Sequence, residues 1–200
     1  LGKGGFVTSI ITGGTILLKQ WPEMRVDEIN WSMNGRHLEI IGALLLFGSG
    51  DAKAEVSGNA DLVRDGNLDL KVTIHSTLLK LLLPAAWHER IAGLFTAKDA
   101  SFRSSFGSGV ERKFEGDFAV EGCVLRGLPF VNKLAIALQR PDFSLLEFPR
   151  LTGHFTWSPS TGLEITSLAG DKEDVLRLAG TVKVNGAGVV SGRLKASASE

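Results

Sequence analysis

The four histidines are the side chains of this chain best suited to acid–base chemistry or zinc binding. They are His37, His75, His88 and His154, and no two of them stand at a spacing that places a pair of metal ligands on one helix or strand. The dipeptide His88-Glu89 lacks the second histidine of a zinc-protease helix. We interpret it as a solvated helix edge and predict no metal site.

Nucleophilic chemistry and phosphate binding find equally little support. Cys123 is the single cysteine, so no intrachain disulfide forms, and we interpret it as a strand residue. The glycine clusters around Ser49 and Ser108 lack the Lys-Ser/Thr ending of a phosphate loop, and no serine lies in a Gly-x-Ser-x-Gly elbow. These clusters are therefore predicted turns, and we predict a chain that is not an enzyme and needs no cofactor.

Composition limits the function further. Lys plus Arg and Asp plus Glu are both 22, which argues against a nucleic-acid partner. Apolar residues make up 44% and charged residues 22%, enough for one sizeable core. No apolar run approaches the roughly 18 residues of a membrane span. We expect residues 1–200 to form a single β-rich domain, a fragment of a longer protein.

Period-two alternation predicts that strands dominate the fold. Leu68, Leu70, Val72 and Ile74 alternate with polar residues, which is typical of a strand with one apolar and one wet face. Turn dipeptides are Asn34-Gly35, Asp65-Gly66, Glu121-Gly122 and Asn185-Gly186. We therefore predict a mainly β, antiparallel fold of about ten or eleven strands. The segment 38–47 is apolar on both parities, which indicates a central strand or one covered on both sides.

Two segments instead suggest short helices. The stretch from Thr77 to about Gly93 is rich in leucine and is broken by Pro84, while 128–139 has Pro129 near its start and Pro141 as a stop.

An internal repeat organises the strands. Trp31-Ser32 leads through Gly35 into Leu-Glu-Ile, and Trp157-Ser158 leads through Gly162 into the same tripeptide. Each copy continues into a charged turn and an apolar-x-Gly-x-apolar strand, with a shortened copy between them. The predicted units are 24–93, 94–140 and 143–197, which suggests stacked hairpins that form a curved or groove-like sheet.

The strand glycines of these units share the parity of the apolar residues. They are Gly58, Gly116, Gly153 and Gly180. A glycine on the apolar face permits a bend of the sheet over a helix, or leaves room for a ligand.

Two short helices can cover only part of so large an apolar face. The sheet could close as a barrel or sandwich, or stay open as an apolar groove suited to acyl chains. For the open groove, the candidate lipid-facing residues are Phe114, Phe118, Val120, Phe155, Val182 and Val184.

Residues 148–158, 162–170 and 175–185, with the helix-like segment from Leu128, give the chain a family likeness. It resembles the C-terminal domain of AsmA-like proteins, most closely over 111–198 and more faintly over 24–83. The resemblance implies a periplasmic part of a large cell-envelope protein with an upstream membrane anchor. It further implies a long β-groove for moving phospholipid between membranes or for supporting outer-membrane biogenesis, with no catalytic residues.

The leading hypothesis is thus a non-enzymatic envelope segment that shields lipid acyl chains. The alternative is a structural or adhesive β-domain with a fully buried core and no ligand. An enzyme site assembled from scattered residues is the third possibility.

Overall fold

Twelve antiparallel strands form one sheet in the computed structural model, which describes residues 6–16, 24–47, 52–83, 85–106, 111–137, 139–172, 176–185 and 189–198. The predicted mainly β, antiparallel fold is confirmed. The strands are β1 Phe6–Thr12, β2 Thr15–Ile16, β3 Met24–Asn34, β4 His37–Phe47, β5 Ala52–Asp61, β6 Asn67–Leu78, β7 Ile91–Ser105, β8 Arg112–Arg126, β9 Leu145–Ser158, β10 Gly162–Lys172, β11 Leu176–Val184 and β12 Val190–Ala198.

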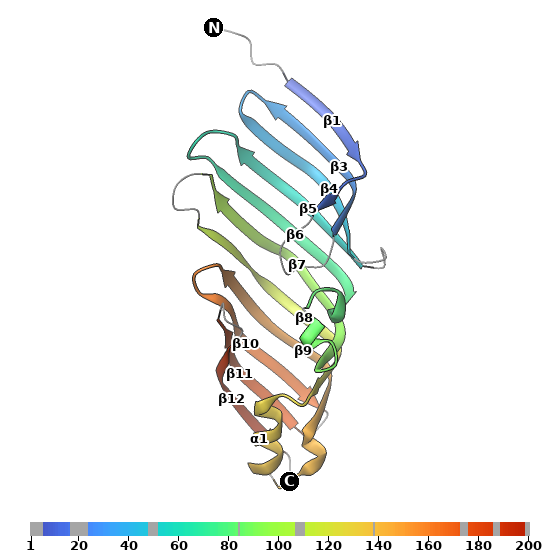
Figure 1. Cartoon of the computed structure of the whole chain (residues 1–200), viewed down its shortest axis with the longest axis vertical. Coiled ribbons are helices and arrows are strands. Elements are labelled where there is room, and N and C mark those ends of the chain that lie inside the picture. Colours follow the sequence, from blue (N-terminus) through green and yellow to red (C-terminus); the bar gives the residue numbers. More distant parts are fainter. Residues whose placement is uncertain are drawn as a thin grey trace.

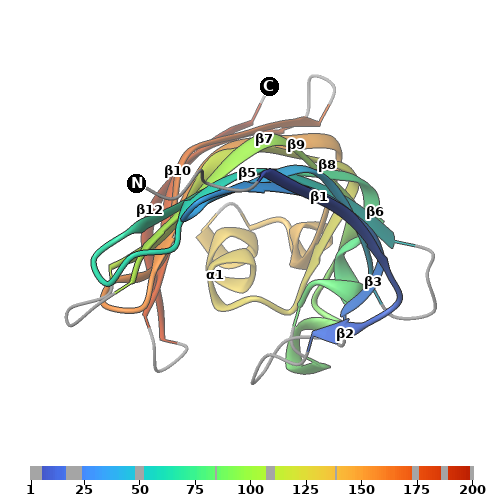
Figure 2. The same ribbon diagram turned by 90° about the horizontal axis from the view of Figure 1, so that it is seen from above.

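The strand order follows the chain. Each strand pairs with its sequence neighbours from β1 through β3 to β12, and the two-residue β2 pairs beside β3. The sheet does not close, because β1 and β12 stand at opposite ends of this order (Figure 1). Seen along the direction in which the strands stack, the sheet is an arch with a concave and a convex side (Figure 2).

The alternating sequence gives the sheet its two faces. In β6 the half-buried Leu70 and Val72 and the buried Ile74 alternate with exposed or polar residues, as a pleated strand requires. Segment 38–47 forms β4, an interior strand. Its apolar residues occur at both odd and even positions because the strand contains a bulge. Its register with β5 shifts between Ile40 and Ala43, so both of these residues face the same side.

One predicted turn is a bulge instead. Asn34-Gly35 does begin the tight β3–β4 turn, with Asn34 opposite His37 and Gly35 at a φ of +63°. Gly122, in contrast, lies inside β8 at a φ of +57°, where the register with β7 shifts: Glu121 lies opposite Leu94, but Val124 lies opposite Ala92. The bulge reverses the parity of β8, so that Cys123 points to the same side as Val120.

Only one of the two predicted helices is an α-helix. Helix α1 spans Pro129–Ala137, within the predicted 128–139. The helix expected over 77–92 is wrong: β6 runs on to Leu78 and β7 begins at Ile91, and between them the described residues form only the 3₁₀ turns Leu79–Leu81 and Ala85–Trp87. Pairing of Thr77 with Phe95 and of Leu78 with Leu94 extends the sheet into this segment, so the predicted helix cannot begin at Thr77. A third 3₁₀ turn, Pro141–Ser144, follows α1.

The core lies on the concave side, where α1 and the 3₁₀ turns sit (Figure 2). The larger apolar cluster joins Val131 and Ala135 of α1 to β7–β11 through residues such as Leu146, Phe148 and Leu151. A smaller cluster around Phe47 and Ile74 joins β3 to β6. Packing is therefore concentrated in the C-terminal half of the sheet.

The two tryptophan hairpins share strand direction but not residue register. Trp31 of β3 lies opposite Ile40 of β4, whereas Trp157 of β9 lies opposite Leu163 of β10, the counterpart of Leu38. The predicted boundary between the first and second repeat units, at residues 93/94, falls inside β7. The predicted turns around Ser49 and Ser108, and the second residue of Asn185-Gly186, lie outside the described residues. Among those described, no helix is long and apolar enough to cross a membrane.

Candidate functional site

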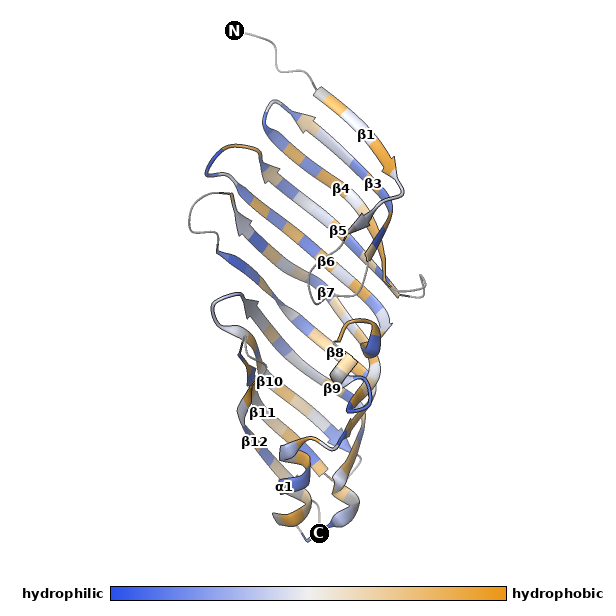
Figure 3. Ribbon diagram, viewed as in Figure 1, coloured by the Kyte–Doolittle hydropathy of each residue, from blue (hydrophilic) through white to orange (hydrophobic). Residues whose placement is uncertain are grey.

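The convex face of the sheet carries cross-strand ion pairs. Lys183 Nζ lies 2.9 Å from Glu164 Oε1, Arg177 Nε donates to Asp171 Oδ2 at 3.0 Å, and His154 Nδ1 lies 2.8 Å from Asp117 Oδ1. The blue and orange alternation along single strands shows the two faces (Figure 3). These side chains are exposed, so this face is in contact with solvent. Exposed ion pairs of this kind add little stability.

One ion pair on this face lowers the pKa of its carboxylate. Lys113 Nζ lies 2.6 Å from Glu115 Oε2. This hydrogen bond, with weaker help from the charges nearby, holds the pKa of Glu115 below its ordinary value. Glu115 is therefore an ionised carboxylate near neutral pH and a poor proton donor.

The concave face carries a continuous apolar row that crosses the sheet. Residues directly opposite each other in an antiparallel pair lie on one face, and the registers of nine successive strands link one residue to the next. We call this set the tryptophan row: Trp31, Ile40, Gly58, Leu70, Phe102, Phe114, Trp157, Leu163 and Val184. All of its members are half-buried. The row is thus an apolar strip that remains in part accessible.

A second row, nearer to α1, is covered. Phe95, Val120, Leu151, Gly170 and Leu178 lie opposite one another from β7 to β11. Val120 is 3% exposed and Leu178 2%, because this part of the face packs into the large cluster with α1. From β7 to β11 the concave face is therefore largely covered near α1, whereas it remains partly accessible along the tryptophan row.

Phenylalanine rings connect the two rows. The ring of Phe114 meets those of Phe102 and Phe155 edge to face, with centroids 6.3 Å and 4.9 Å away. Phe155 in turn lies 6.4 Å from Phe118, which stacks on Phe95 at 5.8 Å. These geometries are favourable for aromatic pairs and fix the rings in place.

The structure places all six predicted lipid-facing residues on the concave face. Phe114, Val182 and Val184 are half-buried, whereas Phe118, Val120 and Phe155 are buried. Phe155 and Val182 are linked through Ile165, which lies opposite both of them. Half of the predicted set is thus partly accessible, with Phe114 and Val184 in the tryptophan row, and the other half is buried in the core.

Sequence reasoning missed several members of the accessible strip. Leu70, Phe102 and the two tryptophans were not among the predicted contact residues, although Trp157 shares the parity of Gly153. The repeated Trp-Ser dipeptide was the available signal. The indole Nε1 of Trp31 is buried and has no hydrogen-bond partner among the described residues, so this side chain meets an apolar environment.

Two strand glycines in equivalent repeat positions have the same geometry. Gly58 and Gly180 have φ values of +146° and +154°, and an added Cβ would lie 2.1 Å from the carbonyl oxygen of Asp69 and 2.2 Å from that of Arg193. Only glycine suits this close backbone approach. At these two positions glycine therefore allows the backbone of the neighbouring strand to approach closely. At Gly116 the nearest obstacle is a side chain instead, because an added Cβ would lie 2.7 Å from the Cβ of Ala100.

Cys123 and the four histidines lie in different parts of the described structure. No three His, Cys, Asp or Glu side chains lie close enough to hold a metal ion within the described ranges. Cys123 is 1% exposed, and burial raises its pKa to about 12, so the thiol stays protonated. His37, His75 and His154 each face a carboxylate on the convex side. His88 Nε2 instead lies 2.8 Å from the carbonyl oxygen of Leu83.

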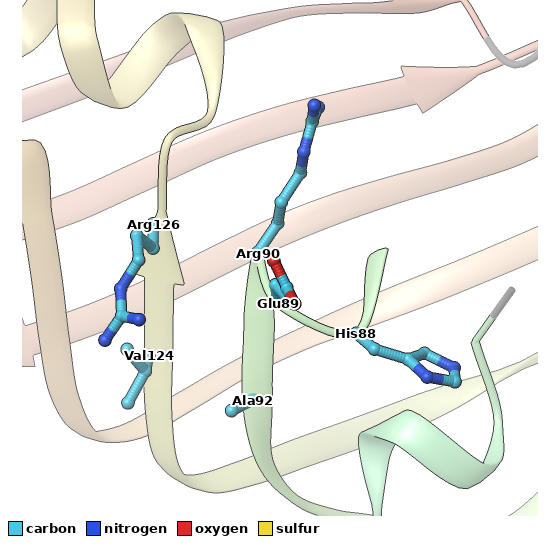
Figure 4. A pocket seen from close by; sticks show the side chains of 6 residues that line it. All are labelled: His88, Glu89, Arg90, Ala92, Val124 and Arg126. Carbon is cyan, nitrogen blue, oxygen red and sulfur yellow. The ribbon is translucent and has the colours of Figure 1, made fainter. Parts of the chain in front are cut away.

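An open pocket of about 540 Å³ lies at the ends of β7 and β8. Its lining is mixed, with apolar and charged side chains from both strands and the preceding turn (Figure 4): His88, Glu89, Arg90, Ala92, Val124 and Arg126.

No protein-family model, curated protein or solved structure matches this chain.

Proposed function

We propose that the concave face binds the acyl chains of a lipid, as a non-enzymatic periplasmic segment of an AsmA-like cell-envelope protein. The observation that carries the proposal is the tryptophan row, an unbroken half-buried apolar strip from β3 to β11. Contiguous exposed apolar surface marks interaction sites.

The chemistry of the strip favours a hydrocarbon partner. Its members offer aliphatic and aromatic surface, and the chain contains no tyrosine that could add a hydroxyl group. A long, flexible acyl chain can lie along the row and contact one strand after another. The resemblance to AsmA-like proteins supports the same partner and adds lipid transport or outer-membrane biogenesis as the purpose.

Competition with a fluorescent fatty acid tests the proposal. Leu70→Asp and Val182→Asp place a charge on the concave face and should weaken binding by about tenfold or more, because desolvating a carboxylate beside an acyl chain is costly. Thr181→Asp is the matched control, since Thr181 lies opposite Arg193 on the convex side. Circular dichroism must show that each variant retains the native sheet.

Burial of Phe118, Val120 and Phe155 favours the alternative, a structural β-domain without ligand. That alternative predicts that the wild-type chain binds no fatty acid or phospholipid, and that result would overturn the lipid proposal.

A further inference from the structure

The first strand of the sheet has an edge that no described strand covers. β1 pairs with β3 along one side only and stands at the end of the strand order (Figure 1). Val7, Ile10 and Ile11 are 46%, 60% and 47% exposed. A free strand edge offers a row of backbone N–H and C=O groups to another strand. β1 therefore combines unpaired backbone with exposed apolar side chains.

The two outer strands of the sheet differ in how they are protected. Natural sheets guard an exposed edge with charged side chains or proline. β12 carries the exposed Arg193 and Lys195, whereas residues 6–12 of β1 contain neither a charge nor a proline. Two copies of β12 would bring like charges together, and like charges on neighbouring strands are destabilising. β1 has no such obstacle to pairing with itself.

The sequence of β1 is complementary to itself in one antiparallel register. Two copies centred on Ser9 place Val7 of each opposite Ile11 of the other, and Thr8 opposite Ile10. Residues directly opposite each other lie on one face, so Val7 and Ile11 meet on one side of the junction and Thr8 and Ile10 on the other. The exposed apolar side chains of both copies are thus covered together, and no two charges meet.

We propose that two copies of this chain associate through β1 as a two-fold symmetric, antiparallel pair of strands. The two-fold axis passes between Ser9 and its copy, perpendicular to the sheet, so the concave sides of both sheets face the same way. Ser9 lies opposite Trp31, and the tryptophan rows of the two copies therefore run into each other through the two serines. An isologous contact closes on itself and gives a dimer. Because the shared edge is only seven residues long, we expect a dissociation constant in the micromolar range.

Sedimentation equilibrium over a micromolar concentration series tests the proposal. The mass of the wild-type chain should rise from one copy to two. Ile10→Lys and Thr8→Glu should each prevent this rise, because either change puts two like charges on diagonal positions roughly 7–8 Å apart across the junction. The two variants mixed in equal amounts should form a dimer again, since the introduced lysine of one lies opposite the introduced glutamate of the other.

Ser191→Glu is the matched control on the other edge. Ser191 is exposed on β12 opposite Lys183, and its replacement should leave the dimer unchanged. Circular dichroism must show that every variant keeps the native sheet. A wild-type chain that stays monomeric, a dimer indifferent to the β1 variants, or mixed variants that fail to pair would each overturn the proposal. A mass that grows beyond two copies would instead show head-to-tail joining of β1 to β12 and would also overturn it.

Discussion

Trp31 of β3 and Trp157 of β9 lie in one cross-strand row on the concave face, linked residue by residue through Ile40, Gly58, Leu70, Phe102 and Phe114. Two hairpins with similar sequences thus place their indoles on the same strip. Both rings are half-buried, so each can report on a ligand that lies along it.

We expect acyl chains brominated along their length to quench the fluorescence of both indoles. Bromine quenches on close contact, and a chain lying on the row would reach each ring. Trp31→Phe and Trp157→Phe should each remove part of the quenched intensity. Quenching unchanged in the double variant would place the chain elsewhere on the protein.

Replacing Gly180 by alanine should lower the free energy of unfolding by about 1–3 kcal/mol, because the side chain would be strained at a φ of +154° and would collide with the Arg193 carbonyl. Urea unfolding measures the change. Gly42 of β4 is the matched control, since a Cβ there meets nothing within 4 Å. Gly42→Ala should be neutral or slightly stabilising. Equal effects of the two substitutions would contradict this account.

Cys123 should make the protein less stable at alkaline pH. Its folded pKa of about 12 lies above the ordinary value of 9.0 because the thiol is buried. As the pH rises, the thiol therefore deprotonates in the unfolded chain before it does so in the folded protein. The free energy of unfolding is highest below pH 9 and falls as the pH rises toward 12. The slope from this thiol approaches about 1.4 kcal/mol per pH unit.

Urea unfolding between pH 8.5 and 10.5 tests the slope against Cys123→Ala, which lacks the thiol. The folded protein should also react slowly with thiol reagents until it unfolds. An identical pH dependence in the two proteins would show that Cys123 is not the cause.

Hydrogen exchange should be faster in β3–β5 than in β8–β10. The first group rests on the small cluster around Phe47 and Ile74, whereas the second shares the large cluster with α1. Fewer buried apolar contacts lower the cost of local opening. Uniform protection of both regions, measured by mass spectrometry of peptides, would argue against separate local stabilities.

The sequence predicted the strands and their apolar face, because period-two alternation is a local property. It misplaced two features that depend on longer-range pairing. Gly122 was predicted to lie in a turn, since a glycine at positive φ serves a hairpin turn and a bulge equally well. The segment 77–92 was predicted to be helical, and pairing of Thr77 with Phe95 overrides its leucine pattern.

The candidate site was only partly predictable for a related reason. Parity assigns Phe114 and Phe118 to the same face, but it says nothing of depth. Phe118 is buried because it and its cross-strand neighbour Ala97 belong to the large cluster that includes α1, while Phe114 lies nearer the start of β8. The row that joins Trp31 to Trp157 depends on the register of every intervening pair, which no single segment encodes.

The strand order also bears on how such a protein could change in size. From β4 to β12 each strand pairs only with its neighbours along the chain, so a hairpin inserted into this part of the meander would interrupt one pairing and leave all others intact. An added pair of strands restores both chain direction and sidedness. Duplication of hairpins could therefore lengthen the apolar surface in steps, with no redesign of the strands already present.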